Sequence, residues 1–120
     1  MADVGIPWQI SQWKIFEVTL PGRTDRTRHF AGYSLALRVP KITGPIAQFD
    51  PTKKRGLDES GNKFALIGLS RVSTDVEPAW QAWVADQHAR DVRDISRDVT
   101  KMLILHSGAE PIDWREKAFG

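Results

Sequence analysis

The sequence predicts an α+β fold in which an antiparallel β-meander of four or five strands precedes one long C-terminal amphipathic helix. Between residues 13 and 70, runs rich in β-branched and aromatic residues alternate with turn signals, which is typical of consecutive antiparallel strands. After residue 73, apolar residues recur at helical spacing instead. A single domain of 120 residues is therefore expected, with an N-terminal arm (1–12), an antiparallel sheet (13–70), a helix (74–106) and a tail (107–120).

The sheet is predicted from apolar alternation at a period of two and from the residues that interrupt it. Pro21-Gly22 ends the first run, Pro40 ends the second, and Asp50-Pro51 has the chemistry of a type I turn. A further turn at 60–62 precedes the last run. The expected strands are residues 13–20, 28–39, 46–49, 54–58 and 63–69.

The helix is predicted from a start signal and an apolar stripe. Thr74 and Glu77 fit a capping box, in which each side chain bonds the other residue's backbone amide. A helix of about 28 residues would measure about 42 Å, whereas strands of about six residues span only about 20 Å. We therefore expect a second copy of the chain to cover the excess, as a homodimer through the C-terminal helix. The stripe comprises Trp80, Trp83, Val84, His88, Val92, Ile95, Val99, Met102 and Leu103.

Composition excludes several classes of protein. Hydrophobic residues make up 41% and charged residues 27% of the chain, a balance typical of globular proteins rather than disordered ones. The absence of cysteine excludes a disulfide scaffold and any cysteine-ligated metal. No apolar run approaches the roughly 18 residues of a membrane helix, and the first residues do not form a secretory signal. A cytoplasmic protein without a membrane partner is expected.

No catalytic signature stands out. The three histidines, His29, His88 and His106, lack a second ligand at metal spacing, and no Gly-x-Ser-x-Gly motif or glycine-rich phosphate loop is present. We therefore expect no cofactor, no metal and no enzymatic activity. An enzyme would need a pocket in which His29 or His88 meets a carboxylate.

The distribution of charge favours an anionic partner. The first 72 residues hold 11 basic and 6 acidic residues, whereas the last 48 hold 6 basic and 9 acidic ones. Two basic loops at strand connections could grip phosphates from one edge of the sheet, while Tyr33 and Trp13 contact bases. The alternative is that the loops are ordinary solvated turns and that Tyr33 belongs to the core. The loops hold Arg23, Arg26 and Arg28, and Lys53, Lys54 and Arg55.

Five tryptophans exceed what so small a core requires, and tryptophan is enriched at recognition surfaces. Trp80 and Trp83, three residues apart, are expected to anchor the helix to the sheet. Trp8 and Trp114 lie outside any clear periodicity and are the candidates for a protein interface.

Four segments of the chain carry a resemblance: residues 29–33 (HFAGY), 46–51 (IAQFDP), 60–66 (SGNKFAL) and 80–83 (WQAW). Over about the central half of the chain, they resemble small uncharacterised proteins encoded by bacterial plasmids and integrative elements. The resemblance implies a bacterial accessory protein of a mobile element. The first interpretation is a non-enzymatic nucleic-acid-binding or regulatory protein; the alternative is an inhibitor of a host defence complex, of the anti-restriction or anti-CRISPR type. The predicted order of elements also looks like that of Whirly single-strand-binding proteins, which dimerise through helices.

Overall fold

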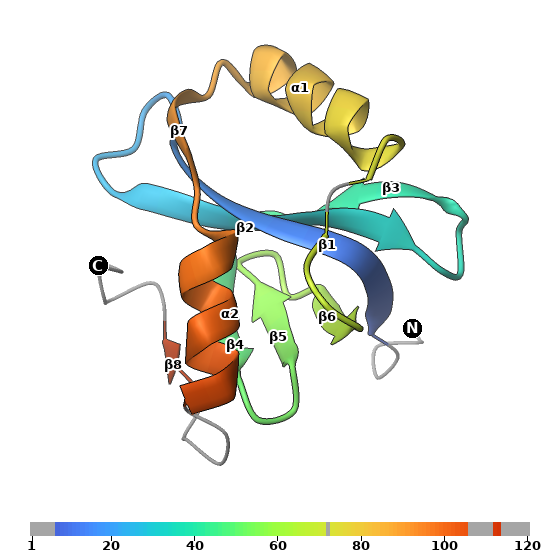
Figure 1. Ribbon diagram of the computed structural model, residues 1–120. Coiled ribbons are helices and arrows are strands. Elements are labelled where there is room, and N and C mark those ends of the chain that lie inside the picture. Colours follow the sequence, from blue (N-terminus) through green and yellow to red (C-terminus); the bar gives the residue numbers. More distant parts are fainter. Residues whose placement is uncertain (1–6, 72, 106–111, 114–120) are drawn as a thin grey trace.

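A computed structural model describes residues 7–71, 73–105 and 112–113 (Figure 1). Within these ranges the chain forms eight strands and two short helices. The strands are β1 (Trp8–Thr19), β2 (Arg26–Ser34), β3 (Val39–Ile42), β4 (Ile46–Asp50), β5 (Arg55–Asp58), β6 (Lys63–Ile67), β7 (Arg90–Asp94) and β8 (Ile112–Asp113). The helices are α1 (Val76–Gln87) and α2 (Ser96–Leu105).

The sheet is mixed, with β1 at its centre. Its strands follow the order β3-β2-β1-β6-β5-β4-β8, and β7 pairs with β1 outside this path. The β1–β6 pair is parallel, whereas the other pairs are antiparallel. The expectation of one antiparallel meander is therefore wrong, because two three-stranded meanders meet through a parallel pair. The turn at residues 35–38 also divides the predicted strand 28–39 into β2 and β3.

Strand β1 can pair with three other strands because it bends. Its register against β2 shifts between Ser11 and Lys14, and Gln12 has a positive φ of 48°. A bulge of this kind changes the direction of a strand. The first part of β1 pairs with β6 and the last part pairs with β7. Residues 8–12 thus belong to the sheet rather than to an N-terminal arm.

Two hydrophobic cores lie on opposite faces of β1 and β2. Figure 1 shows α1 across one face, whereas α2 and the β4–β5–β6 meander lie beyond the other. The α1-side core consists of Phe16, Val18, Ala31, Val76 and Trp80. The α2-side core consists of Ile10, Trp13, Ile15, Phe30, Ile46, Phe49, Phe64, Leu66, Ile95, Val99 and Met102.

These two cores explain why the predicted helix over residues 74–106 is wrong. Trp80 is buried in the α1-side core and Val99 in the α2-side core, so one straight helix cannot bury both. The chain leaves α1 at His88, which has a left-handed φ of 54°, and crosses between the two faces as β7. Val92, assigned to the apolar stripe, is 42% exposed there. At the start of α1, the Ser73 hydroxyl rather than Thr74 accepts the Val76 amide hydrogen.

The structure also removes the basis for a homodimer through one long helix. The apolar face of α2 is buried against its own chain through Val99 and Met102, together with Ile95 immediately before the helix. The order of elements therefore no longer matches that of the Whirly proteins. Neither helix of the described residues is both long and apolar enough to span a bilayer. Most of the predicted tail, 107–120, lies outside the described residues, apart from β8.

Gly32 permits the close approach of β1 and β2 at the bulge. A Cβ atom there would lie 2.2 Å from Ile10 Cγ2 and 2.8 Å from the Ser11 carbonyl oxygen. We expect Gly32→Ala to lower the free energy of unfolding by about 1–3 kcal/mol, because buried groups must shift to admit the methyl group. Urea denaturation measures the change, with Gln9→Ala at an exposed position of β1 as control. Equal stabilities of the two variants would contradict this prediction.

Candidate functional site

Glu17 is a buried carboxylate that links three strands. It lies on β1, only 3% exposed, and its neighbours across the sheet are Arg28 on β2 and Arg93 on β7. Arg28 Nη2 lies 3.0 Å from Glu17 Oε2, and Arg93 Nη1 donates to Glu17 Oε1 at 3.2 Å. Arg26 Nε donates to the same Oε1 at 2.8 Å. Charged groups survive burial only when they are paired in this way.

The arginines of the first predicted loop are therefore engaged within the chain. Arg26 also donates to the backbone carbonyl of Asp91 at 2.6 Å, and Arg28 is only 5% exposed. Burial lowers the pKa of Arg28, and the charge of Glu17 opposes that shift. Arg23 forms bidentate pairs with Asp25 and Glu59, which raise its pKa above the ordinary value. These three side chains hold the fold together rather than offering free charge to a phosphate.

The two predicted aromatic contacts are also placed apart. Trp13 is 1% exposed, packs edge-on against Phe30 and donates through Nε1 to the Gly68 carbonyl oxygen. Tyr33 is half-buried and packs against the α1-side core. Tyr33 lies on the α1 side, opposite the β4–β5 hairpin (Figure 1), whereas Trp13 lies on the hairpin side but is buried in the core, so the two do not form one base-binding surface with the hairpin.

His29 is a core residue. Its side chain is fully buried beside Trp83, with the two ring centroids 4.6 Å apart. Nδ1 lies 2.9 Å from the Thr43 carbonyl oxygen, which can only accept, so Nδ1 carries the proton. Nε2 therefore accepts from the Thr27 hydroxyl at 2.8 Å. Burial lowers the pKa of His29 to about 4, and the ring is neutral at pH 7.

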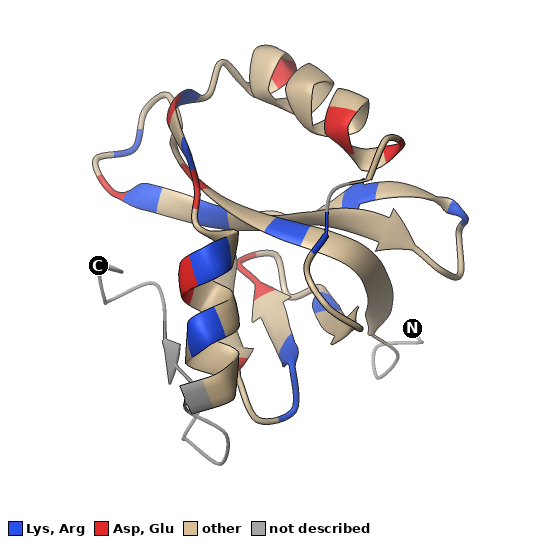
Figure 2. Cartoon of the chain, viewed as in Figure 1, with Lys and Arg blue, Asp and Glu red and all other residues tan. Residues whose placement is uncertain are grey.

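The second predicted basic loop, in contrast, keeps its charges free. Lys53, Lys54 and Arg55 form the β4–β5 turn and the start of β5, and no ion pair binds them within the described part of the chain. The Asp50 carboxylate shapes this turn by accepting the amide hydrogens of Thr52 and Lys53. Figure 2 shows the basic hairpin and the arginine loop at well-separated ends of the molecule, so the two loops do not converge.

Lys63 adds a fourth free cation, which the sequence analysis did not include. It begins β6 and lies opposite Leu57 in the β5–β6 pairing, two residues along β5 from Arg55. The signal was the turn at 60–62, because a hairpin there returns Lys63 alongside β5. We call Lys53, Lys54, Arg55 and Lys63 the hairpin cations. Lys54 is half-buried and the other three are exposed.

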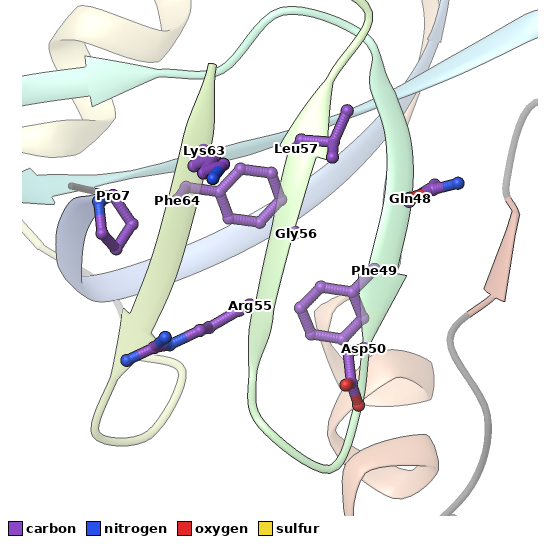
Figure 3. A pocket seen from close by; sticks show the side chains of 9 residues that line it. All are labelled: Pro7, Gln48, Phe49, Asp50, Arg55, Gly56, Leu57, Lys63 and Phe64. Atoms are coloured by element: carbon purple, nitrogen blue, oxygen red, sulfur yellow. The ribbon is translucent and has the colours of Figure 1, made fainter. Parts of the chain in front are cut away.

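A pocket of about 250 Å³ is lined by two of these cations, Arg55 and Lys63 (Figure 3). Arg55 and Lys63 flank it from two sides, while the Gln48 side chain points away. Gly56 and Leu57, both half-buried, form much of its floor, with Pro7 at its side. Its lining is completed by Phe49, Phe64 and Asp50.

The remaining predicted site residues do not gather in one place. Trp8 is half-buried, and the Lys41 ammonium lies 4.0 Å from the centroid of its ring, a cation–π contact. Trp114 lies outside the described residues. In the ranges 7–71, 73–105 and 112–113, no ion pair joins His29 or His88 to a carboxylate, and no cluster of potential metal ligands occurs.

Comparison with protein-family models, with curated proteins and with solved structures gives no match for this chain. The resemblance to plasmid-encoded proteins therefore stays an expectation. Function has to be argued from the residues themselves.

We expect the stability of the protein to fall as the pH decreases from about 6.5 to about 4. In this window the unfolded chain protonates His29 while the folded chain keeps it neutral. The unfolded state therefore binds more protons, and stability falls by at most about 1.4 kcal/mol per pH unit. Urea denaturation at several pH values measures this slope. His29→Gln should flatten it; a slope unchanged in that variant would count against His29 as its source.

We expect Glu17→Gln to destabilise the fold by about 3–5 kcal/mol, because buried Arg28 would lose its charged partner. Asp25→Asn is the matched control, since it also removes one carboxylate from an arginine pair. That pair is solvated, so its loss should cost at most about 1 kcal/mol. Thermal and urea unfolding compare the two variants, and similar losses would refute the assignment.

Proposed function

We propose that this chain is a non-enzymatic nucleic-acid-binding accessory protein that holds the phosphate backbone through the hairpin cations. The supporting observation is that these cations are four neighbouring positive charges without internal counterions in the described residues. Lysine and arginine bound to phosphates release condensed counterions, which supplies much of the affinity. The arginines around Glu17 and Asp25, in contrast, are held in ion pairs with carboxylates of the chain itself.

The shape of the hairpin favours the same function. Asp50 fixes the turn through two backbone amides, so Lys53 and Lys54 are presented on a defined loop rather than on a mobile one. Arg55 and Lys63 continue the charge along β5 and β6. A strand of nucleic acid could therefore follow the hairpin and meet positive charge along its length.

The test is a salt titration of oligonucleotide binding. Removal of two phosphate contacts in Lys53→Gln/Lys54→Gln should reduce the slope of log affinity against log salt by roughly 0.7 for each cation on single strands. Affinity at low salt should fall with it. Fluorescence anisotropy with single- and double-stranded DNA and RNA measures both quantities.

The matched control is Arg38→Gln/Arg71→Gln, which removes the same charge from exposed residues in the β2–β3 turn and after β6. We expect this variant to keep most of the affinity. Equal losses in the two double variants would show attraction by net charge alone. Absent or salt-insensitive binding by the wild-type protein would reject the function.

One observation favours the alternative, a protein that inhibits a host defence complex. Leu35, Leu37 and Val39, at the β2–β3 turn, are 44%, 58% and 46% exposed. Exposed apolar groups in close succession are typical of protein-binding surfaces. If the chain binds no oligonucleotide, a partner protein at this turn becomes the better proposal, and Leu37→Ser should then abolish the host-complex inhibition that the wild-type chain produces.

A further inference from the structure

We infer that the pocket beside the hairpin cations receives one unpaired nucleobase, so that the protein selects single-stranded nucleic acid over duplex. This inference rests on the proposed function and adds the form of nucleic acid that the site takes.

The floor of the pocket is mainly apolar. Gly56 contributes bare backbone, because a Cβ atom there would lie 2.8 Å from Phe64 Cζ and 2.3 Å from the Gln48 carbonyl oxygen. The rings of Phe49 and Phe64 are nearly parallel at 12° and fully buried, so they support this floor from within. Leu57 and Pro7 extend the apolar surface. The apolar face of a nucleobase can lie against such a floor, whereas a strongly hydrated group gains nothing from it.

The size of the pocket matches one base. Pockets for drug-sized ligands usually measure about 300–1,000 Å³. A volume of about 250 Å³ is slightly smaller, which suits a single ring system rather than a dinucleotide or a large cofactor.

The charges around the pocket match the rest of a nucleotide. Figure 3 shows Arg55 and Lys63 on two sides of the apolar floor, so phosphates before and after an inserted base would both meet a cation. Asp50 is the one acidic residue in the lining, and its carboxylate is already shared with two backbone amides. An acyl chain would use the floor but not the cations, and a bare phosphate would use the cations but not the floor.

Because the bases of a duplex are paired, the pocket should bind single-stranded nucleic acid in preference to duplex. In a duplex each base is stacked and paired, so it cannot enter a side pocket unless it is extruded at a cost of a few kcal/mol. An unpaired strand enters without that cost. The site should therefore discriminate by strandedness rather than by sequence.

The experiment measures three ligands against the wild-type protein at one salt concentration. They are a short unstructured single strand, an abasic strand with the same number of phosphates, and the duplex of the first strand. Lying against the apolar floor removes one face of the base from water, so the intact strand should bind about tenfold tighter than the abasic one. The duplex should bind no tighter than the abasic strand.

A variant then fills the pocket without removing charge. Leu57→Trp should lower the affinity for the intact strand to that for the abasic strand and leave abasic binding unchanged. Leu37→Trp, on the exposed β2–β3 turn, adds the same ring elsewhere and should preserve the wild-type preference. If Leu57→Trp does not fold, the affinities of the wild-type protein for the three ligands are sufficient to test the pocket.

The outcomes separate the two proposals. Equal affinities for intact and abasic strands would overturn the pocket while leaving phosphate binding by the hairpin cations in place. No salt-dependent binding to any ligand would overturn both. A nucleoside monophosphate that binds as tightly as the intact strand would overturn the assignment to a strand, because the pocket alone would then account for all of the affinity.

Discussion

The rest of the structure depends on β1 being paired along both edges and buried on both faces. Ile15 and Phe16 point into different cores, and Glu17 between Phe16 and Val18 is buried as well. A buried carboxylate must be neutralised, and here arginines from β2 and β7 do so. Glu17 thereby requires that the segment after α1 return to β1 as a strand. The two helices are consequently held on opposite faces of the sheet.

This arrangement divides the charged residues into two populations. Around Glu17 and Asp25, cations and carboxylates form ion pairs that join segments far apart in the sequence. On the β4–β5 hairpin, Asp50 uses its carboxylate on the backbone of the turn, which leaves the neighbouring lysines without an internal partner. The formal net charge of +2 does not distinguish the ion-paired residues from the unpaired hairpin cations. Under the proposed function, the cations that contact phosphate are those that lack an internal partner.

Sequence reasoning located most strands and turns, because alternation and proline or glycine are local signals. It missed what depends on distant residues. Glu17 alternates with Phe16 and Val18 and so looks like a solvent-facing position until Arg28 and Arg93 are seen beside it. Ile95 and Val99 continue the helical spacing of Trp80 and Val84, although the two pairs pack in different cores. Of the predicted site residues, Lys53, Lys54 and Arg55 have no ion-pair partner in the described part of the chain. Lys63 and the pocket could be recognised only from the way β5 pairs with β6.

The parallel pairing of β1 with β6 has a consequence for how the molecule assembles. Trp8 lies opposite Phe64, and Glu17 lies opposite Arg93, so β1 finds two of its neighbours only after β6 and β7, much later in the chain, have been made. Contacts between such distant segments are slow to form, because a long loop must close first. Until then only the β1–β2 hairpin can shelter the apolar side chains of β1. The nascent chain is therefore most prone to aggregation before β6 and β7 arrive.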